Sequence, residues 1–339
     1  MQPDQLRIAI NGCGRIGGAV AKILLLGEEP NLRLVAINDH ATAYELQGYL
    51  QRDSVYGRFP LPVRLSGQEL IVGATVVKTF QKEEPELLPW GKLKVDVVVE
   101  STGSFTSERE ARRHLRAGAK TVLISTAPHA GRVEFFVQGA GAKTGSLQGP
   151  ILSHASCTTT AVAPVMSMLQ ENFTVKAWTL FAVQSVTHSQ EVVDKAHGEG
   201  RRRRQALDNI VPITLDTDRA LPYVFSKNLL NYAGQGVRVP TTIVHLAMLT
   251  VLLKERTTPA EINTALRRAA RTHNWQGLVR VSDELLVSQD LRQTSQSATI
   301  DAGLTKVAGG NLVQLGVWYD NEWAFAQRLV DLLSKLAKG

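Results

Sequence analysis

The sequence predicts an α/β protein of two domains, in which a doubly wound parallel sheet precedes an α+β domain. In the first half, short apolar β-branched runs alternate with helix-like stretches, and a glycine-rich turn joins the first run to the first helix. From about Cys157 onward, long β-rich stretches dominate. With 339 residues, 44% of them apolar and 20% charged, the chain is long enough to build two packed domains.

The elements of the first half follow the chain in order. Leu6–Asn11 is a short β-branched run that ends at glycines, and Ile16–Leu26 has the apolar spacing of a helix. The next apolar run, Leu32–Asn38, predicts a second strand that ends at Asp39. Two further strands and a charged helix are predicted at Val95–Val99, Thr121–Ile124 and Ser107–Ala117. Strands that alternate with helices in this way favour a parallel sheet.

The second half has a different pattern of predicted elements. A helix-like segment runs from Cys157 to about Asn172, and Glu322–Lys338 again has helical spacing with one broad apolar face. Between these helices, β-rich stretches are predicted at Lys176–Thr187, Gly236–Leu253 and Asn311–Tyr319.

Composition narrows the class of protein. Two cysteines cannot form a disulfide framework, which favours a reducing compartment. The chain starts without a basic segment followed by an apolar run, and its most apolar stretch, Leu246–Leu253, is too short to span a bilayer. We therefore expect a cytoplasmic protein that makes no membrane contact. No metal site is predicted.

The net charge of +7 is spread along the chain, apart from one run at Arg201–Arg204. Such an excess suits an anionic small-molecule ligand, a nucleic-acid surface or simple solubility, and charge alone does not choose among them. Aromatic residues make up 6% of the chain and do not interleave with these arginines, so base stacking has no support in the sequence. We do not expect a nucleic-acid partner.

The turn after the first strand has the pattern of a dinucleotide site. Gly12, Gly14 and Gly17 form Gly-x-Gly-x-x-Gly, which permits a tight turn and lets a pyrophosphate approach the start of a helix. Asp39, at the end of the second strand, can accept hydrogen bonds from a ribose diol and would repel a ribose phosphate. A solvated turn with a solvated aspartate is the alternative. The combination of strand, glycines, helix and acid favours a Rossmann-type site for NAD over NADP.

The two cysteines differ in setting. Cys13 lies between two of the glycines, where a small buried side chain is the simpler interpretation. Cys157 lies among hydroxyl residues just before a helical segment, where a helix N-terminus stabilises a thiolate and offers N–H groups to an oxyanion. By position alone, Cys157 fits a nucleophile and a buried structural residue equally well.

Several motifs across nearly the whole chain resemble the glyceraldehyde-3-phosphate dehydrogenase family, which includes erythrose-4-phosphate dehydrogenase. They are Ile10-Asn11-Gly12 with Gly14-Arg15-Ile16-Gly17, Ala36-Ile37-Asn38-Asp39, Asp53-Ser54, Glu100-Ser101-Thr102-Gly103, Ala155-Ser156-Cys157-Thr158-Thr159, Arg238-Val239-Pro240-Thr241 and Trp318-Tyr319-Asp320-Asn321-Glu322-Trp323. Their number and order make the resemblance highly specific.

The resemblance implies a domain plan, a cofactor and partners. The implied plan is a Rossmann-type NAD-binding domain over residues 1–156, an α+β catalytic domain over 157–321 and a C-terminal helix over 322–339 that returns to the first domain. The implied cofactor is NAD and the implied assembly a homotetramer. The implied substrate is a phosphorylated aldehyde of the glyceraldehyde 3-phosphate or erythrose 4-phosphate type, with inorganic phosphate as acyl acceptor.

The resemblance also implies roles for single residues. Cys157 would form a hemithioacetal with the aldehyde and, after hydride transfer, a thioester. The implied cofactor-binding residues are Gly12, Gly14, Arg15, Ile16, Gly17, Asp39, Ser101, Thr102, Gly103 and Asn321, the last holding the nicotinamide carboxamide. The implied substrate-binding residues are Ser156, Thr158, Thr187, Arg238 and one arginine of the Arg201–Arg204 run, taken as Arg204. Guanidinium and hydroxyl donors suit phosphate oxygens.

This chain departs from the family at the catalytic base. The family has a histidine that pairs with the cysteine, and the matching position here is Gln184. Glutamine neither takes a proton nor carries charge, so the thiol loses its imidazolium partner. General-base assistance is typically worth about 10²- to 10⁴-fold, so we expect a large loss of activity. His188 and His154 are candidate replacements for the base.

A second departure follows Ile210-Val211-Pro212, where the family usually presents a threonine and a glycine to the second anion site. Leu215 and Asp216 fall at those positions unless a one-residue shift brings Thr214 there. A carboxylate at this point would repel phosphate. Thr160, where asparagine is usual, is a smaller change.

Three functions remain open at this stage. The first is NAD-dependent oxidation of a phosphorylated aldehyde through Cys157. The second is a divergent NAD-binding protein with weak or no dehydrogenase activity, in a binding or regulatory role. In the third, water releases the thioester as an acid, or the thiol carries out slow esterase-like acyl transfer.

Overall fold

The computed structural model describes residues 5–140, 147, 149–187, 190–196, 200–225 and 229–338. The chain divides into two compact units. The first is Met1–Phe136, Gly145–Ser156 and Phe325–Gly339, and the second is Val137–Thr144 and Cys157–Ala324. Within the described residues, no helix has both the length and the apolar character needed to cross a membrane.

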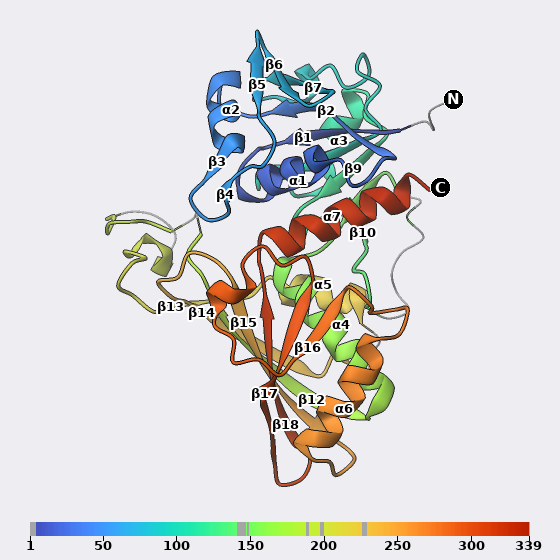
Figure 1. Ribbon diagram of the computed structural model, residues 1–339, viewed down its shortest axis with the longest axis vertical. Helices are drawn as coiled ribbons and strands as arrows, with labels where there is room; N and C mark the ends of the chain where they lie inside the picture. The colour runs from blue at the N-terminus through green and yellow to red at the C-terminus, as the bar shows by residue number, and fades with distance from the viewer. Residues whose placement is uncertain are drawn as a thin grey trace. The chain divides into compact units, whose positions relative to one another are not determined.

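The first unit is built on a nine-stranded sheet in the order β10-β11-β9-β8-β1-β2-β7-β6-β5 (Figure 1). Its strands are β1 (Leu6–Asn11), β2 (Leu32–Asn38), β5 (Arg64–Ser66), β6 (Glu69–Val72), β7 (Thr75–Phe80), β8 (Val97–Glu100), β9 (Thr121–Ile124), β10 (Glu134–Phe135) and β11 (Ile151–Ser153). Neighbouring strands are parallel except in the β5-β6-β7 meander, which is antiparallel. A separate small hairpin pairs β3 (Arg52–Asp53) with β4 (Gly57–Arg58).

Helices α1 (Arg15–Leu26), α2 (Ala43–Gln51) and α3 (Glu108–Arg116) belong to this unit, with a 3₁₀ turn, η1, at Pro85–Leu87. Glycine ends α1, since Gly27 takes the left-handed conformation that a C-cap requires. Capping boxes start the other two, Thr42 with Glu45 in α2 and Ser107 with Glu110 in α3.

The strand order places a switch point between β1 and β8. From β1, the chain crosses through α1 to β2 on one side, whereas β8 and α3 continue to β9 on the other side. In doubly wound sheets, ligands bind outside the carboxyl ends of the strands at such a point. The turns that follow β1 and β8 are therefore the expected place for a cofactor.

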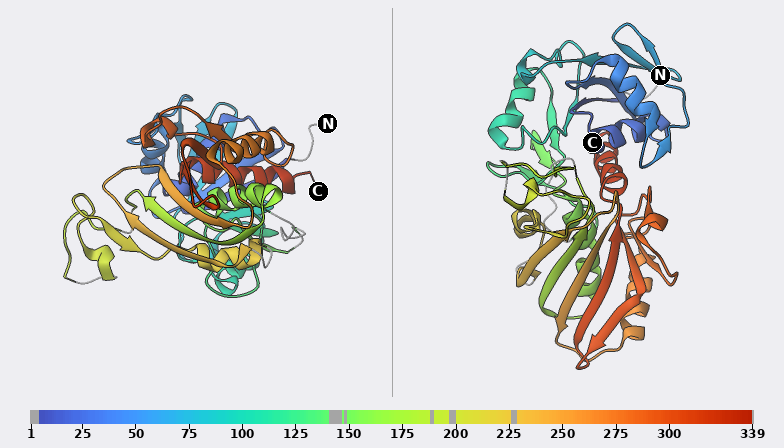
Figure 2. Two further views of the ribbon diagram at one scale, coloured as in Figure 1. Left: turned by 90° about the horizontal axis from the view of Figure 1, so that it is seen from below. Right: turned by 90° about the vertical axis from the view of Figure 1, so that its left-hand side faces the viewer.

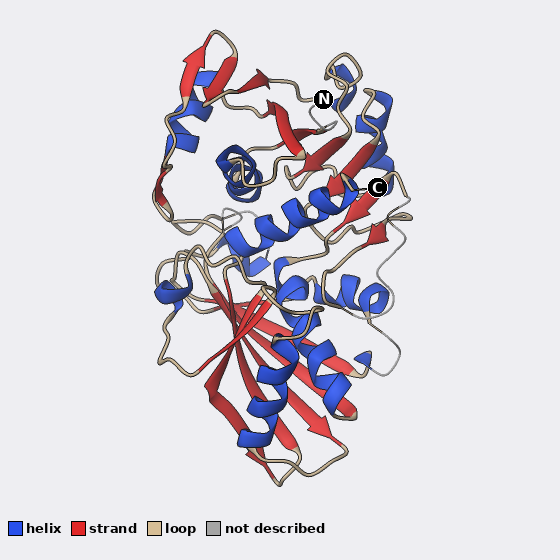
Figure 3. Cartoon of the chain, turned by 45° about the vertical axis from the view of Figure 1, so that its right-hand side comes forward, coloured by secondary structure: helices blue, strands red, loops and turns tan. Residues whose placement is uncertain are grey.

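The second unit is built on a seven-stranded mixed sheet in the order β13-β14-β12-β15-β18-β17-β16. Its strands are β12 (Val175–Gln184), β13 (Val211–Ile213), β14 (Tyr232–Arg238), β15 (His245–Leu253), β16 (Val279–Ser282), β17 (Ala298–Ala308) and β18 (Leu312–Tyr319). Its helices are α4 (Cys157–Asn172), α5 (Thr217–Val224) and α6 (Pro259–Ala270), with 3₁₀ turns η2 (Gly200–Arg203) and η4 (Ser288–Leu291). Helices α4 and α6 cover one face of the sheet (Figures 2 and 3).

The predicted α/β class and the predicted return of the C-terminal helix are confirmed. Helix α7 spans Trp323–Leu336, and from Phe325 onward its residues belong to the first unit. Its inner face carries the apolar residues that its spacing predicted, including the fully buried Leu329 and Val330.

One predicted β-rich stretch is divided between two strands. The stretch Gly236–Leu253 is not continuous, because β14 ends at Arg238 and β15 begins at His245. Pro240, which has no N–H to donate, lies in the break, and Val244 has φ 69°. Strands β14 and β15 pair with opposite edges of β12, so the chain must leave the sheet between them. Among the elements that the sequence analysis does not predict are the β5-β6-β7 meander, α2, α6, β16 and β17.

Candidate active site

The three glycines of the turn after β1 differ in what surrounds the position of a Cβ atom. Gly12 has φ +88°, and a Cβ there would lie 2.7 Å from the backbone nitrogen of Thr102. A Cβ on Gly17 would lie 2.0 Å from the carbonyl oxygen of Gly12. Gly14, in contrast, is exposed, and apart from Gly14 and its chain neighbours no described residue has an atom within 4 Å of the position of its Cβ. Two glycines thus allow the chain to pack, and the third leaves the backbone open to a ligand at the start of α1.

The turn after β8 is fastened to the glycine turn. The Ser101 hydroxyl donates to the Gly12 carbonyl oxygen at 2.6 Å, and the Ser101 N–H donates to the Asn11 carbonyl oxygen at 2.8 Å. Buried Glu100 accepts from the backbone N–H of Thr102 at 2.8 Å. Gly103, with φ +76°, completes the turn. The predicted cofactor-binding residues of β1 and β8 therefore meet at the switch point.

Asp39 lies beside this turn at the end of β2. Its carboxylate accepts hydrogen bonds from the backbone N–H groups of Cys13, at 2.6 Å, and Ala41, at 2.9 Å. Arg15, at the start of α1, pairs with Asp53 at 3.0 Å, and Ile16 is half-buried. The glycine cradle, the helix start and a fixed carboxylate together fit the adenosine ribose and pyrophosphate of NAD.

Cys157 is the first residue of α4. The chain reaches it from β11 through Ala155, which has φ +63°, a conformation that alanine rarely adopts and that is found at strained functional turns. Cys157 is half-buried, whereas Cys13 is buried, as its sequence setting predicted. Burial raises the pKa of the Cys157 thiol to about 11, more than the nearby Thr158 hydroxyl and the positive charge of Arg238 lower it. The group at position 157 is thus a thiol at neutral pH.

Four side chains meet in one row across the second sheet. Gln184 on β12 is in register with Arg238 on β14. On the other side of β12, the pairing of Val183 with Leu246 places Gln184 beside His245 on β15, and His245 is opposite Tyr319 on β18. Register therefore brings together residues that are more than 130 positions apart in the sequence.

Gln184 connects this row to the cysteine helix. Its Nε2 donates to the Thr158 hydroxyl at 3.2 Å, and that hydroxyl also bonds to the Tyr319 hydroxyl at 2.9 Å. Gln184 thus takes part in a hydrogen-bond network next to Cys157, yet its amide has no site that accepts a proton at neutral pH. The expected base position is occupied by a group that can only position its neighbours.

His245 is a site residue that the sequence analysis missed. Its Nε2 bonds to the Ser185 hydroxyl at 3.0 Å and its ring meets Tyr319 edge to face, with centroids 5.2 Å apart. Burial, together with the charge of Arg238, lowers its pKa well below 6.5, so the imidazole is neutral. Its place in the apolar run of β15 looks like a core position, and only the strand register reveals its neighbours.

Of the two candidate replacement bases, His154 belongs to the first unit and is buried. Its ring meets Phe136 and Phe325 edge to face, each about 6.1 Å away. Burial and the charge of Arg328 lower its pKa to about 3, so His154 is a poor proton acceptor. His188 lies outside the described residues.

The residues expected to bind phosphate are partly brought together. Arg238 donates to the Ser185 carbonyl oxygen at 3.1 Å, and its Nε is buried with no hydrogen-bond partner among the described residues. Thr187, just beyond the end of β12, is half-buried, and its N–H donates to Gln190 at 3.3 Å. Ser156 is the last residue before α4.

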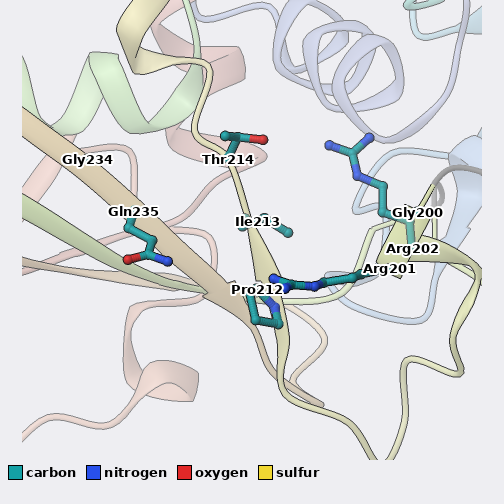
Figure 4. A pocket seen from close by; sticks show the side chains of 8 residues that line it. All are labelled: Gly200, Arg201, Arg202, Pro212, Ile213, Thr214, Gly234 and Gln235. Carbon is teal, nitrogen blue, oxygen red and sulfur yellow. The ribbon is translucent and has the colours of Figure 1, made fainter.

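The arginine run borders a cavity of about 460 Å³ next to β13 and β14. Figure 4 shows the lining residues, which are Gly200, Arg201, Arg202, Pro212, Ile213, Thr214, Gly234 and Gln235. Arg202 is close enough to Arg238 for its charge to lower the pKa of that guanidinium, although burial is the larger cause. Arg204 instead pairs with Asp194 at 2.8 Å, with both side chains largely exposed.

Comparison with known proteins identifies the relatives of this chain. Residues 6–108 match the NAD binding domain of glyceraldehyde 3-phosphate dehydrogenase, and residues 156–321 match its C-terminal domain. The chain belongs to the glyceraldehyde 3-phosphate dehydrogenase family. It is 39% identical over 332 residues to the enzyme of Thermotoga maritima, which covers 98% of this chain and 99% of that protein.

Other members of the glyceraldehyde 3-phosphate dehydrogenase family are similarly close. The enzyme of Zymomonas mobilis is 37% identical over 334 residues, which is 98% of this chain and 99% of that protein. The chloroplastic enzyme A of Zea mays is 38% identical over 330 residues, which is 97% of this chain and 81% of that protein. The family and its cofactor, NAD, are thus as the sequence predicted.

The family also places Asn321 in the catalytic domain, at the last residue of the C-terminal match. Its side-chain oxygen accepts from the N–H of Val244 at 3.1 Å, the residue with positive φ just before His245. This bond uses the amide oxygen of Asn321 as an acceptor, and the donor group of the side chain is its NH₂, which suits a carboxamide oxygen.

Proposed function

We propose that the protein oxidises a phosphorylated aldehyde with NAD, through a thioester on Cys157, at a rate limited by the glutamine at position 184. The single observation that carries the proposal is Cys157 itself, at the N-terminus of α4 beside Arg238, in a chain whose family oxidises such aldehydes. The sugar phosphate is of the glyceraldehyde 3-phosphate or erythrose 4-phosphate size.

The chain's own residues act in sequence. Arg238 and Thr187 hold the substrate phosphate. The buried Nε of Arg238, which has no partner in the part of the chain that the structure describes, is a donor available for it. Cys157 adds to the aldehyde carbon, and the N–H groups at the start of α4 stabilise the resulting oxyanion. NAD, when bound to the glycine turn, supplies a hydride acceptor. Asn321 and Asp39 orient that cofactor through its carboxamide and ribose.

The slow step is the loss of the thiol proton, which passes to solvent water. With a pKa of about 11, only about one Cys157 in ten thousand is a thiolate at pH 7. Gln184 holds Thr158 and Tyr319 in place but accepts no proton. We therefore expect turnover well below that of an enzyme with a histidine at this position.

We also propose a homotetramer in the cytoplasm. Four apolar side chains between β12 and β13 are more than half exposed, which supports their burial against other copies of the chain. They are Val192, Val193, Leu207 and Ile210. Analytical ultracentrifugation measures the assembly directly.

The experiment follows the formation of NADH from glyceraldehyde 3-phosphate and from erythrose 4-phosphate. We expect Cys157→Ser to lower kcat by at least about 10³-fold, because a hydroxyl is a far weaker nucleophile than a thiolate. The matched control is Cys13→Ser, which changes the other cysteine and should retain turnover. If the purified protein binds NAD but reduces none with either aldehyde, the divergent, non-enzymatic function takes the place of this proposal.

A further inference from the structure

Three neighbouring parallel strands of the first sheet end in polar side chains that are hydrogen-bonded to one another. Glu100 ends β8, Asn11 ends β1 and Asn38 ends β2, and the strand register places Asn11 opposite both of the others. The side-chain N–H of Asn11 donates to Glu100 at 2.6 Å, and that of Asn38 donates to the side-chain oxygen of Asn11 at 2.7 Å. All three residues are buried. They form a strand-end row that crosses the carboxyl edge of the sheet.

The strand-end row directly precedes the turns that are expected to bind NAD. Each of its members is followed in the chain by one of the predicted cofactor-binding residues, which are Gly12, Asp39 and Ser101. The backbone also joins two of these turns, because the Gly12 N–H donates to the Asn38 carbonyl oxygen at 2.8 Å. A change that displaces the row therefore displaces the turns as well.

Glu100 is the acidic member of the row, and both of its carboxylate oxygens have two partners. Oε1 accepts from the backbone N–H and from the hydroxyl of Thr102. Oε2 accepts from Asn11 and lies 3.0 Å from Nε2 of His114, and these two nitrogens are 3.4 Å apart because they converge on one oxygen. A buried carboxylate requires such partners, since burial removes its water. Through Thr102, the same carboxylate holds the turn after β8.

Trp90 decides which nitrogen of His114 carries the proton. Its indole N–H is 3.0 Å from Nδ1 of His114. An indole nitrogen is a donor only, so Nδ1 accepts this bond, and the proton of the ring is on Nε2, which donates to Glu100. Trp90 precedes β8 and His114 belongs to α3, and both are fully buried. They therefore act on the row from inside the protein and not by contact with a ligand.

We propose that Trp90 and His114 are positioning residues for NAD binding. Trp90 keeps the proton of His114 on the nitrogen that faces Glu100. Glu100 in turn holds Thr102 and Asn11, which fix the turns after β8 and β1. A turn that already has its binding conformation loses less conformational freedom when the ligand binds, so the affinity is higher. The inference concerns NAD binding alone and does not depend on the proposed thioester.

Two substitutions of His114 separate its hydrogen bonds from its volume. Glutamine offers a donor and an acceptor, as this imidazole does, whereas leucine offers neither. We expect His114→Leu to raise the Kd for NAD about 10- to 100-fold, because the buried carboxylate of Glu100 loses a donor, and His114→Gln to raise it less than about threefold. Isothermal titration calorimetry measures Kd, and circular dichroism verifies that each variant is folded. Equal affinities of the two variants would overturn the proposal.

A substitution of Trp90 tests the place of the proton, and it decides the matter if His114→Leu does not fold. We expect Trp90→Phe to raise Kd about three- to tenfold, because without the indole N–H the proton of His114 can move to Nδ1. The matched control is Trp275→Phe, which removes a buried indole N–H that donates to the Gly139 carbonyl oxygen at 2.9 Å in the second unit. It should lower the melting temperature but leave Kd unchanged. The same result for Trp90→Phe, a lower melting temperature with an unchanged Kd, would contradict a positioning role.

Discussion

The cofactor turn of the first unit and the cysteine site of the second unit belong to one family but depart from its pattern to different degrees. In the first unit, Gly12, Gly17 and Asp39 have the packing or hydrogen bonds that their predicted roles require. In the second unit, the cysteine proposed as the nucleophile is present, but Gln184 stands where the family resemblance implies a histidine base, and Asp216 is a carboxylate. The comparison teaches that NAD binding and thiol activation rest on separate sets of residues in this chain.

The largest expected effect comes from restoring the base. We expect Gln184→His to raise kcat for the phosphorylated aldehyde by about 10²- to 10⁴-fold, because an imidazole next to Thr158 both accepts the thiol proton and stabilises the thiolate. The measurement is steady-state formation of NADH. Gln184→Asn is the control, since it keeps an amide and should not accelerate the reaction. An unchanged rate would mean that another group already performs this task.

The next largest effect is expected in the rate at which the Cys157 thiol is alkylated. A pKa of about 11 leaves about one Cys157 in a thousand as a thiolate at pH 8, whereas an ordinary cysteine is about one-quarter ionised there. We expect alkylation by iodoacetamide to be about 10²-fold slower than for free cysteine. Because the pKa is raised, the rate should climb about tenfold per pH unit and level off only near pH 11.

Peptide mass spectrometry separates the two cysteines in that experiment. Cys13, whose pKa is raised to about 12 by burial, should react still more slowly. Rapid alkylation of Cys157 below pH 8 would show that a group other than residue 184 generates the thiolate. The cysteine site would then depart from the family pattern less than its geometry indicates.

These two regions also differ in how far the sequence alone predicts them. The glycine turn is local, because Gly12, Gly14 and Gly17 lie within six residues, and a nearby backbone requires both Gly12 and Gly17. The row of side chains at the second site is not local, because Gln184, Arg238, His245 and Tyr319 meet only through the pairing of four strands. His245 sits in an apolar run and looks like core until that pairing is known. The family resemblance supplied Cys157, Arg238 and the departure at Gln184, whereas no motif marks His245.

A substitution in the cofactor site is expected to have a moderate effect on NAD affinity, and it tests whether the first unit keeps the family pattern. We expect Asp39→Asn to weaken NAD binding by about 10- to 100-fold, since a hydrogen bond to a charged group is worth about 1.5–3 kcal/mol. The preference for NAD over NADP should fall as well, because the repelling charge is gone. Isothermal titration calorimetry measures both affinities.

Glu69→Gln is the control for that variant, because it removes an exposed carboxylate of the same unit that pairs only loosely, at 3.4 Å, with Lys78. NAD affinity unaltered by Asp39→Asn would contradict the role of Asp39 at the ribose, and it would also remove the evidence that the first unit keeps the family pattern intact.

The smallest expected effects are changes in KM, and they distinguish two arginines of the Arg201–Arg204 run. Arg202 lines the cavity and its charge reaches Arg238, whereas Arg204 pairs with Asp194 at the surface. We expect Arg202→Gln to raise KM for the phosphorylated aldehyde about tenfold, as the loss of one charged hydrogen bond implies. Arg204→Gln should raise it less than about threefold, because exposed ion pairs contribute 0–1 kcal/mol. The reverse order would show that Arg204 leaves Asp194 to meet the substrate, as the family resemblance implied, and that the anion site forms only when substrate binds.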